Sequence, residues 1–228
     1  AGAWGGRIWG AGGAALGASI LAASYAPELN ILGAVITAPN STFPDGPIAL
    51  EARHSNTIFL SLATGGLRDN APRIDALLTP EGLQLLDVAR QSCTREIALK
   101  SRELKIGSFS QLLTISAQAL SALRSPTTDM PQATIAFPLL IATGQADETI
   151  TPVRQYAVAA ALCAAGNQVT WQTYEGLGHD GVMHGSLNEA FAFARAQLEG
   201  QGYDSNCATI QRPGAPGERN PSAPFNDD

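Results

Sequence analysis

The sequence predicts an α/β fold built on a parallel β-sheet. Three runs, residues 30–38, 138–143 and 168–174, are either apolar throughout or alternate as half-buried strands do. A helix with clear start and end signals lies between the second and third runs, and another helix follows the third. Strand and helix in alternation are typical of a parallel sheet covered by helices. The fold class is therefore α/β.

The three strands differ in their expected burial. Asn30–Ala38 and Pro138–Thr143 are apolar on both faces, as in buried strands of a parallel sheet. Gln168–Tyr174 alternates and is followed by Glu175 and Gly176, which is typical of a strand nearer the edge of a sheet. We expect no clear strand in the Gly-rich residues 1–13.

The two core helices are bounded by recognisable signals. Thr151 as N-cap, Pro152 in the first turn and Gly166 at the end predict a helix between the second and third strands. Ser186 and Glu189 have the spacing of a capping box, and they predict a last helix that runs to Gly200.

The rest of the chain divides into an insertion and a tail. Residues 40–132 contain helical patterns, such as the one that follows Thr79-Pro80-Glu81, and no convincing strand, so they predict a helical cap or lid. Residues 208–228 are rich in Pro, Gly, Asn and Asp, and they predict a disordered tail. The predicted core comprises residues 1–39 and 133–207.

Composition excludes several classes of partner. With 228 residues, of which 45% are hydrophobic, the chain has room for one sizeable domain. A net charge of -6 without a basic run argues against a nucleic-acid partner, and no apolar stretch is long enough to span a membrane. We expect a small-molecule partner.

The three cysteines cannot all pair with one another. Cys163 falls in the predicted helix and Cys207 follows the last helix, so a disulfide between them would attach the tail to the core. Two unpaired thiols are the alternative. The sequence does not assign a partner to Cys93.

Two polar residues stand where chemistry is expected in such a sheet. Asp147 follows the second strand and His179 follows the third, so both lie beyond the carboxyl ends of neighbouring strands. A carboxylate that orients an imidazole is the arrangement of acyl-transfer enzymes. A turn aspartate and a loop histidine are the alternatives. A metal site formed by His179, His184 and Asp180 is not favoured, since no helix is predicted there to align them.

Several segments resemble the secretory lipase family of bacteria and fungi. They are the stretch from Ser24 to Val35, with its Tyr-Ala-Pro-Glu-Leu sequence, the stretch Leu78-Thr-Pro-Glu-Gly with Cys93 downstream, and the loops of Asp147 and His179. The resemblance implies an α/β-hydrolase core with a mostly helical lid. It also implies that Asp147 and His179 are the catalytic acid and histidine, and that Cys163 pairs with Cys207.

The sequence departs from this family at the nucleophile. The family's Gly-x-Ser-x-Gly elbow would fall within the first residues, where the nearest counterpart places Ala11 at the position of the serine. Gly12 would then supply an oxyanion N–H group. Ser19 lacks the second glycine of the elbow. The strands that precede the elbow in the family have no counterpart, so we expect the N-terminal part of the fold to be missing.

The resulting hypothesis is a secreted hydrolase of carboxylic esters or lipids that needs no cofactor. Its nucleophile is not identifiable from the sequence. Two alternatives stay open: an inactive family member that binds an apolar ligand or a partner, and a peptidase or acyltransferase on the same fold.

Overall fold

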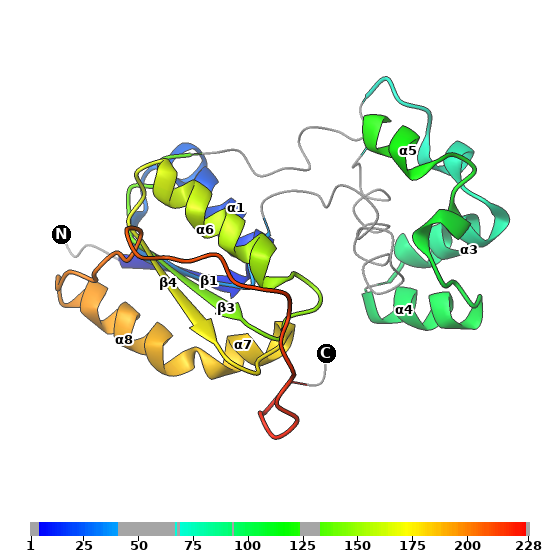
Figure 1. Cartoon of the computed structure of the whole chain (residues 1–228). Helices are drawn as coiled ribbons and strands as arrows, with labels where there is room; N and C mark the ends of the chain where they lie inside the picture. Colours follow the sequence, from blue (N-terminus) through cyan, green and yellow to red (C-terminus); the bar gives the residue numbers. More distant parts are fainter. Residues whose placement is uncertain (1–4, 41–66, 68, 93, 124–132, 227–228) are drawn as a thin grey trace. The chain divides into compact units, whose positions relative to one another are not determined.

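The computed structural model describes residues 5–40, 67, 69–92, 94–123 and 133–226 (Figure 1). The chain forms two compact units, one comprising residues 1–41 with 130–228 and the other residues 42–129. The first unit contains the sheet, and the second is helical in its described part.

The sheet has four parallel strands in the order β1-β2-β3-β4. They are β1 (Gly5–Ala11), β2 (Asn30–Thr37), β3 (Leu139–Gly144) and β4 (Val169–Tyr174). The last three confirm the strands predicted from the sequence, and the α/β class is confirmed with them. Because all four strands are parallel, their carboxyl ends share one edge of the sheet.

Strand β1 was not predicted, because its sequence Gly-Gly-Arg-Ile-Trp-Gly-Ala has neither an apolar run nor a regular alternation. It forms by pairing with β2, from Gly5 beside Asn30 to Ala11 beside Thr37, with a register shift between Gly6 and Arg7. Tertiary pairing here overrides a weak local preference.

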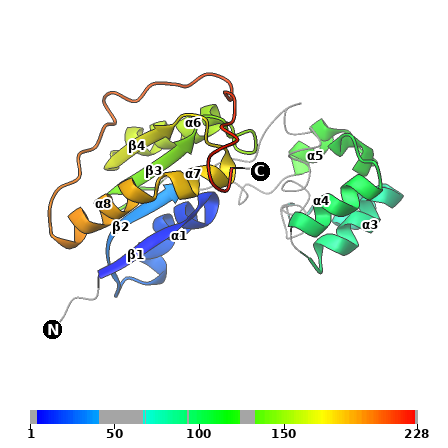
Figure 2. The same ribbon diagram turned by 90° about the horizontal axis from the view of Figure 1, so that it is seen from below.

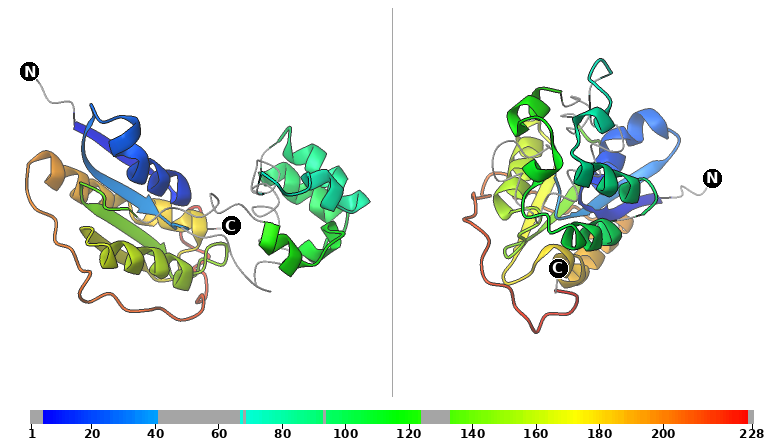
Figure 3. Two further views of the ribbon diagram at one scale, coloured as in Figure 1. Left: turned by 90° about the horizontal axis from the view of Figure 1, so that it is seen from above. Right: turned by 90° about the vertical axis from the view of Figure 1, so that its right-hand side faces the viewer.

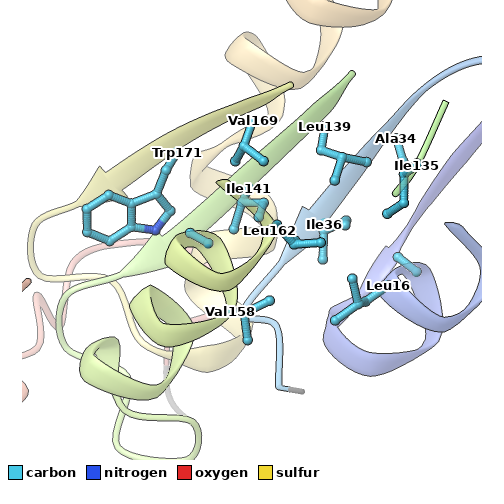
Figure 4. Packing of buried hydrophobic residues seen from close by; sticks show 12 residues of the cluster. Leu16, Ala34, Ile36, Ile135, Leu139, Ile141, Val158, Leu162, Val169 and Trp171 are labelled. Carbon is cyan, nitrogen blue, oxygen red and sulfur yellow. The ribbon is translucent and has the colours of Figure 1, made fainter. Parts of the chain in front are cut away.

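Helices cover both faces of the sheet. Helices α1 (Gly12–Tyr25) and α6 (Pro152–Ala164) lie on one face, and α8 (Leu187–Leu198) lies on the other (Figures 1 and 3). The first face packs into a buried cluster that Figure 4 shows at close range. Its larger members are Leu16, Ile36, Ile135, Leu139, Ile141, Val158, Leu162, Val169 and Trp171.

The opposite face has its own cluster. Val35 of β2 and Leu140 of β3 pack there with Ala190 and Phe193 of α8. Successive residues of one strand therefore serve both clusters, which is why these strands are apolar on both faces.

Helix boundaries confirm one predicted signal and correct another. Thr151 takes the N-cap position of α6, although its side chain makes no capping hydrogen bond; Pro152 begins the helix, and Gly166 follows its end with a φ of 81°. Ser186 precedes α8 but does not cap it with its side chain, and its hydroxyl donates to Met183 O at 3.4 Å instead. The capping-box prediction was wrong because a short helix that was not predicted, α7 (His179–Gly185), runs directly into Ser186.

The second unit is built from short helices in its described part: η2 (Ile74–Leu77), α3 (Pro80–Ala89), α4 (Thr94–Glu103), η3 (Phe109–Leu112) and α5 (Ala117–Leu123). As its sequence predicts, α3 begins after Thr79, whose hydroxyl accepts a hydrogen bond from Gly82 N at 3.2 Å. Leu85, Leu86, Ile97, Phe109 and Leu112 are fully buried and form a separate core.

The segment after α8 has no helix or strand, yet it follows a defined course past β4 and α6 and back to the edge where α7 lies (Figures 1 and 2). The side chain of Asn206 bonds both Trp171 N and Trp171 O at 2.8 Å. The Cys163–Cys207 disulfide and the packing of Ile210 against the core cluster also attach this segment to the core. The disorder predicted for residues 208–228 stays a prediction.

Among the residues that the structure describes, no helix has the length and apolar character needed to cross a membrane.

Candidate active site

Asp147 lies in the loop that follows β3 and is fully buried. Its Oδ1 accepts hydrogen bonds from the backbone N–H groups of Thr149 and Ile150, both at 2.8 Å. Its Oδ2 faces the ring of His179. A buried carboxylate needs such partners, since its burial without them is costly.

His179 begins helix α7, directly after the loop that follows β4. Its Nδ1 lies 2.9 Å from Asp147 Oδ2, and its side chain is 27% exposed. Because an ionised carboxylate only accepts hydrogen bonds, the Nδ1 atom carries the proton that joins the pair. The neutral ring then has its basic lone pair on Nε2, which is the tautomer that a general base needs.

The two loops approach each other closely. Gln145 N donates to Tyr174 O, and Ala146 N donates to Leu177 O, both at 2.9 Å. Gly144 lies at the contact, where a Cβ would overlap the carbonyl oxygen of Leu177. A glycine at this position is therefore required for Asp147 to reach His179.

Gln155 on α6 is a further polar residue of the site that sequence reasoning missed. It is fully buried, and its Nε2 donates to Asp147 Oδ2 at 2.7 Å and to Ile150 O at 2.6 Å. An amide on the mostly apolar helix α6, eight residues after the acid, is the signal that would have found it.

Arg154 places a positive charge near the acid. Its Nη2 donates to Asn40 Oδ1 at 2.5 Å, which links α6 to the residues beyond β2. Burial lowers the pKa of Arg154 from its usual value, and the negative charge of Asp147 opposes that change. No local pattern in the sequence indicated this contact, which joins residues 114 positions apart.

The turn between β1 and α1 has the form of strand, sharp turn and helix that a nucleophile elbow takes. Gly12 has a φ of 40°, and a Cβ there would lie 2.8 Å from Ala38 O. Ala11 ends the strand, so the predicted position coincides with this turn. None of Ala11, Gly12 and Gly13 carries a hydroxyl group.

Ser19 does not supply the missing hydroxyl. It is buried in α1, and its Oγ donates to Ala15 O at 2.8 Å within the same helix. The N–H of Gly12 as an oxyanion donor stays a prediction.

The predicted disulfide is present. Cys163 at the end of α6 and Cys207 after α8 are joined with their Cα atoms 5.5 Å apart. Cys93 lies outside the described residues. Within the described residues, no group of three His, Cys, Asp or Glu side chains is arranged to hold a metal ion.

A parallel sheet with an acid and a histidine in the loops after its last two strands defines an α/β-hydrolase core. The sequence profile described as "Secretory lipase" matches residues 4–204, and the chain belongs to this family. No curated protein sequence matches the chain.

Solved structures share the fold. Two structures of Candida antarctica lipase A, one of them in its closed state, are similar at 21% sequence identity with TM-scores of 0.68 and 0.64. The alignment covers 92% of this chain and 52% of the lipase, so the chain spans about half the length of that protein. A rice cell wall degrading esterase, LipA from Xanthomonas oryzae, is similar at 10% identity with a TM-score of 0.56, over 86% of this chain and 59% of the esterase.

Proposed function

We propose that Asp147 and His179 are the acid and the general base of a carboxylic ester hydrolase that works by acyl transfer. One observation carries the proposal: a buried carboxylate contacts an imidazole at 2.9 Å, beyond the carboxyl ends of adjacent parallel strands. Membership of the secretory lipase family supports an ester or lipid as substrate. The disulfide and the family support a location outside the cell.

In this reaction a hydroxyl oxygen attacks the ester carbonyl while Nε2 of His179 takes the hydroxyl proton. The tetrahedral intermediate then expels the alcohol, which receives that proton from Nε2 and leaves an acyl ester on the nucleophile. Water then attacks the acyl ester while Nε2 takes a proton from it. Nε2 returns this proton to the oxygen of the nucleophile, and the carboxylic acid product is released. Asp147 stays ionised throughout and holds the imidazole in the required tautomer, and no cofactor is needed.

The proposal assigns the acid and the base but no nucleophile. Ala11 occupies the end of β1, where the family's serine is expected, and the turn offers no hydroxyl. This observation favours a second candidate function, that of an inactive family member that binds an apolar ligand or a partner. The lid that the sequence predicts for residues 40–132 stays a prediction under either candidate function.

The test is hydrolysis of a short-chain p-nitrophenyl ester by the chain and by its His179→Ala variant. Asp180→Asn is the matched control, because Asp180 is the exposed neighbour of His179. Labelling with a serine-directed phosphonate, followed by intact mass, shows whether any hydroxyl is activated.

A third variant, Ala11→Ser, separates the two candidate functions. Serine is placed at Ala11 rather than at Gly12, where a side chain would meet Ala38 O. His179-dependent hydrolysis by the wild-type chain would support the enzyme with a nucleophile elsewhere. Activity that appears only in Ala11→Ser and depends on His179 would support a working acid and base in an inactive chain. Folded proteins without His179-dependent hydrolysis in either form would contradict the proposal.

A further inference from the structure

The segment Gly217–Asn226, called here the C-terminal strap, bonds to both loops of the candidate active site. Gly217 N donates to Gln145 O, in the loop that leads to Asp147, at 2.8 Å. Asn220 N donates to Gly176 O, in the loop that leads to His179, also at 2.8 Å. In Figure 1 the strap is the last stretch of the red part of the chain, next to the C-terminus, and Figure 2 shows it beside α7.

The side chain of Asn226 makes the most specific of these contacts. It is 5% exposed, and its Oδ1 accepts a hydrogen bond from Gly178 N at 2.6 Å. Its Nδ2 donates to Gly176 O at 2.9 Å and to Asn220 O at 2.7 Å. One amide group thus binds a donor and an acceptor of the loop immediately before His179.

The surroundings of Asn226 are shaped to receive it. Gly181 on α7 faces the amide so closely that a Cβ there would overlap Asn226 Oδ1. The preceding residue, Phe225, has a φ of 55° and stacks on His184, with ring centroids 4.0 Å apart. A positive φ is costly for a phenylalanine, so contacts on both sides must hold the backbone in this form.

The loop needs such support because its own sequence is permissive. Glycines at 176, 178, 181 and 185 flank or interrupt the seven residues of α7. Glycine loses more conformational freedom on folding than any other residue. A short helix of this composition does not fix the position of its first residue without outside contacts, and that first residue is His179.

We propose that Asn226 is a positioning residue for His179: it fixes the backbone of residues 176–178 and thereby holds the imidazole against Asp147. The inference rests on the role proposed for this pair. It adds that a side chain 47 residues downstream determines the geometry of the general base.

The test uses the full chain and observes the His179–Asp147 hydrogen bond without any need for turnover. In NMR spectra, the Nδ1–H proton of His179 is visible only while Asp147 shields it from exchange, and the Gly178 amide reports the bond to Asn226. For Asn226→Ala we expect loss of the His179 Nδ1–H signal and at least about a tenfold fall in the protection of the Gly178 amide. Asn188→Ala, an exposed asparagine on α8, is the matched control and should change neither.

Asn226→Asp tests the same idea with little change of shape. Aspartate keeps the acceptor for Gly178 N and loses the donors to Gly176 O and Asn220 O, so the signal should persist but exchange faster. If Asn226→Ala shows no cooperative unfolding transition and is therefore not folded, the result for Asn226→Asp decides whether Asn226 positions His179.

An unchanged His179 Nδ1–H signal in both Asn226 variants would overturn the positioning role. Absence of that signal from the folded wild-type chain would overturn the positioning role and the proposed pair together. A signal that depends on Asn226 in a chain without esterase activity would support the positioning role while the proposed function fails.

Discussion

The two loops that carry the acid and the histidine are held in different ways. Apart from the bond to His179 itself, Asp147 receives its side-chain hydrogen bonds from Thr149, Ile150 and Gln155, all within eight residues of it along the chain. The loop before His179 is fixed by Asn220 and Asn226, with the bond to Gly178 spanning 48 residues. The carboxylate of Asp147 is therefore held mainly by its own stretch of sequence, with one strap contact at Gln145 O in its loop, and the histidine loop is held by a remote segment.

This difference means that the two halves of the pair respond to different changes. We expect a substitution on α6 to loosen the acid, and a change in the strap or its attachment to loosen mainly the histidine loop. Both lead to the same lost contact between Asp147 Oδ2 and His179 Nδ1, so local probes are needed to tell them apart.

Asp147→Asn should have the largest effect. The asparagine amide no longer holds the imidazole in the tautomer that leaves Nε2 basic, and the expected loss of kcat is about 10⁴-fold in whichever form of the chain hydrolyses ester. Asp180→Asn, in the exposed position next to His179, serves as the control. A variant that stays within tenfold of its parent would remove Asp147 from the mechanism.

Replacing both disulfide cysteines, by Cys163→Ser with Cys207→Ser, should have the next largest effect, which is on stability. The bond closes a loop of 44 residues, so its loss should lower the free energy of unfolding by about 4 kcal/mol. The measurement is urea unfolding of this variant beside the oxidised wild-type chain.

The same variant sharpens the comparison between the loops. Hydrogen exchange should quicken at the Gly178 amide, because the segment that carries Asn226 has lost its anchor at Cys207. The amides of Thr149 and Ile150 should stay protected. Equal loss of protection in both loops would show that the histidine loop has no separate support.

Gln155→Leu should act on the acid alone. Removing the amide leaves Asp147 Oδ2 without one of its donors, at an expected cost of about 1–3 kcal/mol in the free energy of unfolding. Gln201→Leu, an exposed glutamine beyond α8, is the control. If the Gly178 amide lost protection together with Thr149 and Ile150, the two loops would not be independent.

Tyr174→Phe should have the smallest effect at neutral pH. Burial, followed by the negative charge of Glu189, raises the pKa of Tyr174 above its usual value. The folded chain therefore retains the phenol proton above pH of about 10, where the unfolded chain loses it, and the free energy of unfolding falls as pH rises beyond that point. Tyr174→Phe should therefore make the loss of stability with rising pH shallower. The measurement is urea unfolding at several pH values between about 9 and 11, around the pKa of a free phenol. The control is Tyr25→Phe, on an exposed residue, which should leave this pH dependence unchanged.

Much of the site was accessible from the sequence because its signals are local. Apolar runs predicted β2, β3 and β4, and the positions of Asp147 and His179 followed from the rule that groups beyond parallel strands meet at one edge. Thr151, Pro152 and Gly166 marked the ends of α6, because proline in the first turn and glycine past the last turn are favoured by local backbone conformation. Cys163 and Cys207 were paired by their placement relative to the last helices.

The sequence by itself thus determined the sheet class, the position of the acid and histidine, and the residues of the disulfide. Only the tertiary structure decided that residues 5–11 form a strand, that Gln155 and Arg154 adjoin the acid, and that Asn226 reaches the histidine loop. The physical reason is the same in each case. These features depend on hydrogen bonds and charge contacts that polar or glycine-rich segments make with distant partners. Such segments have no periodic apolar pattern from which these contacts could be predicted.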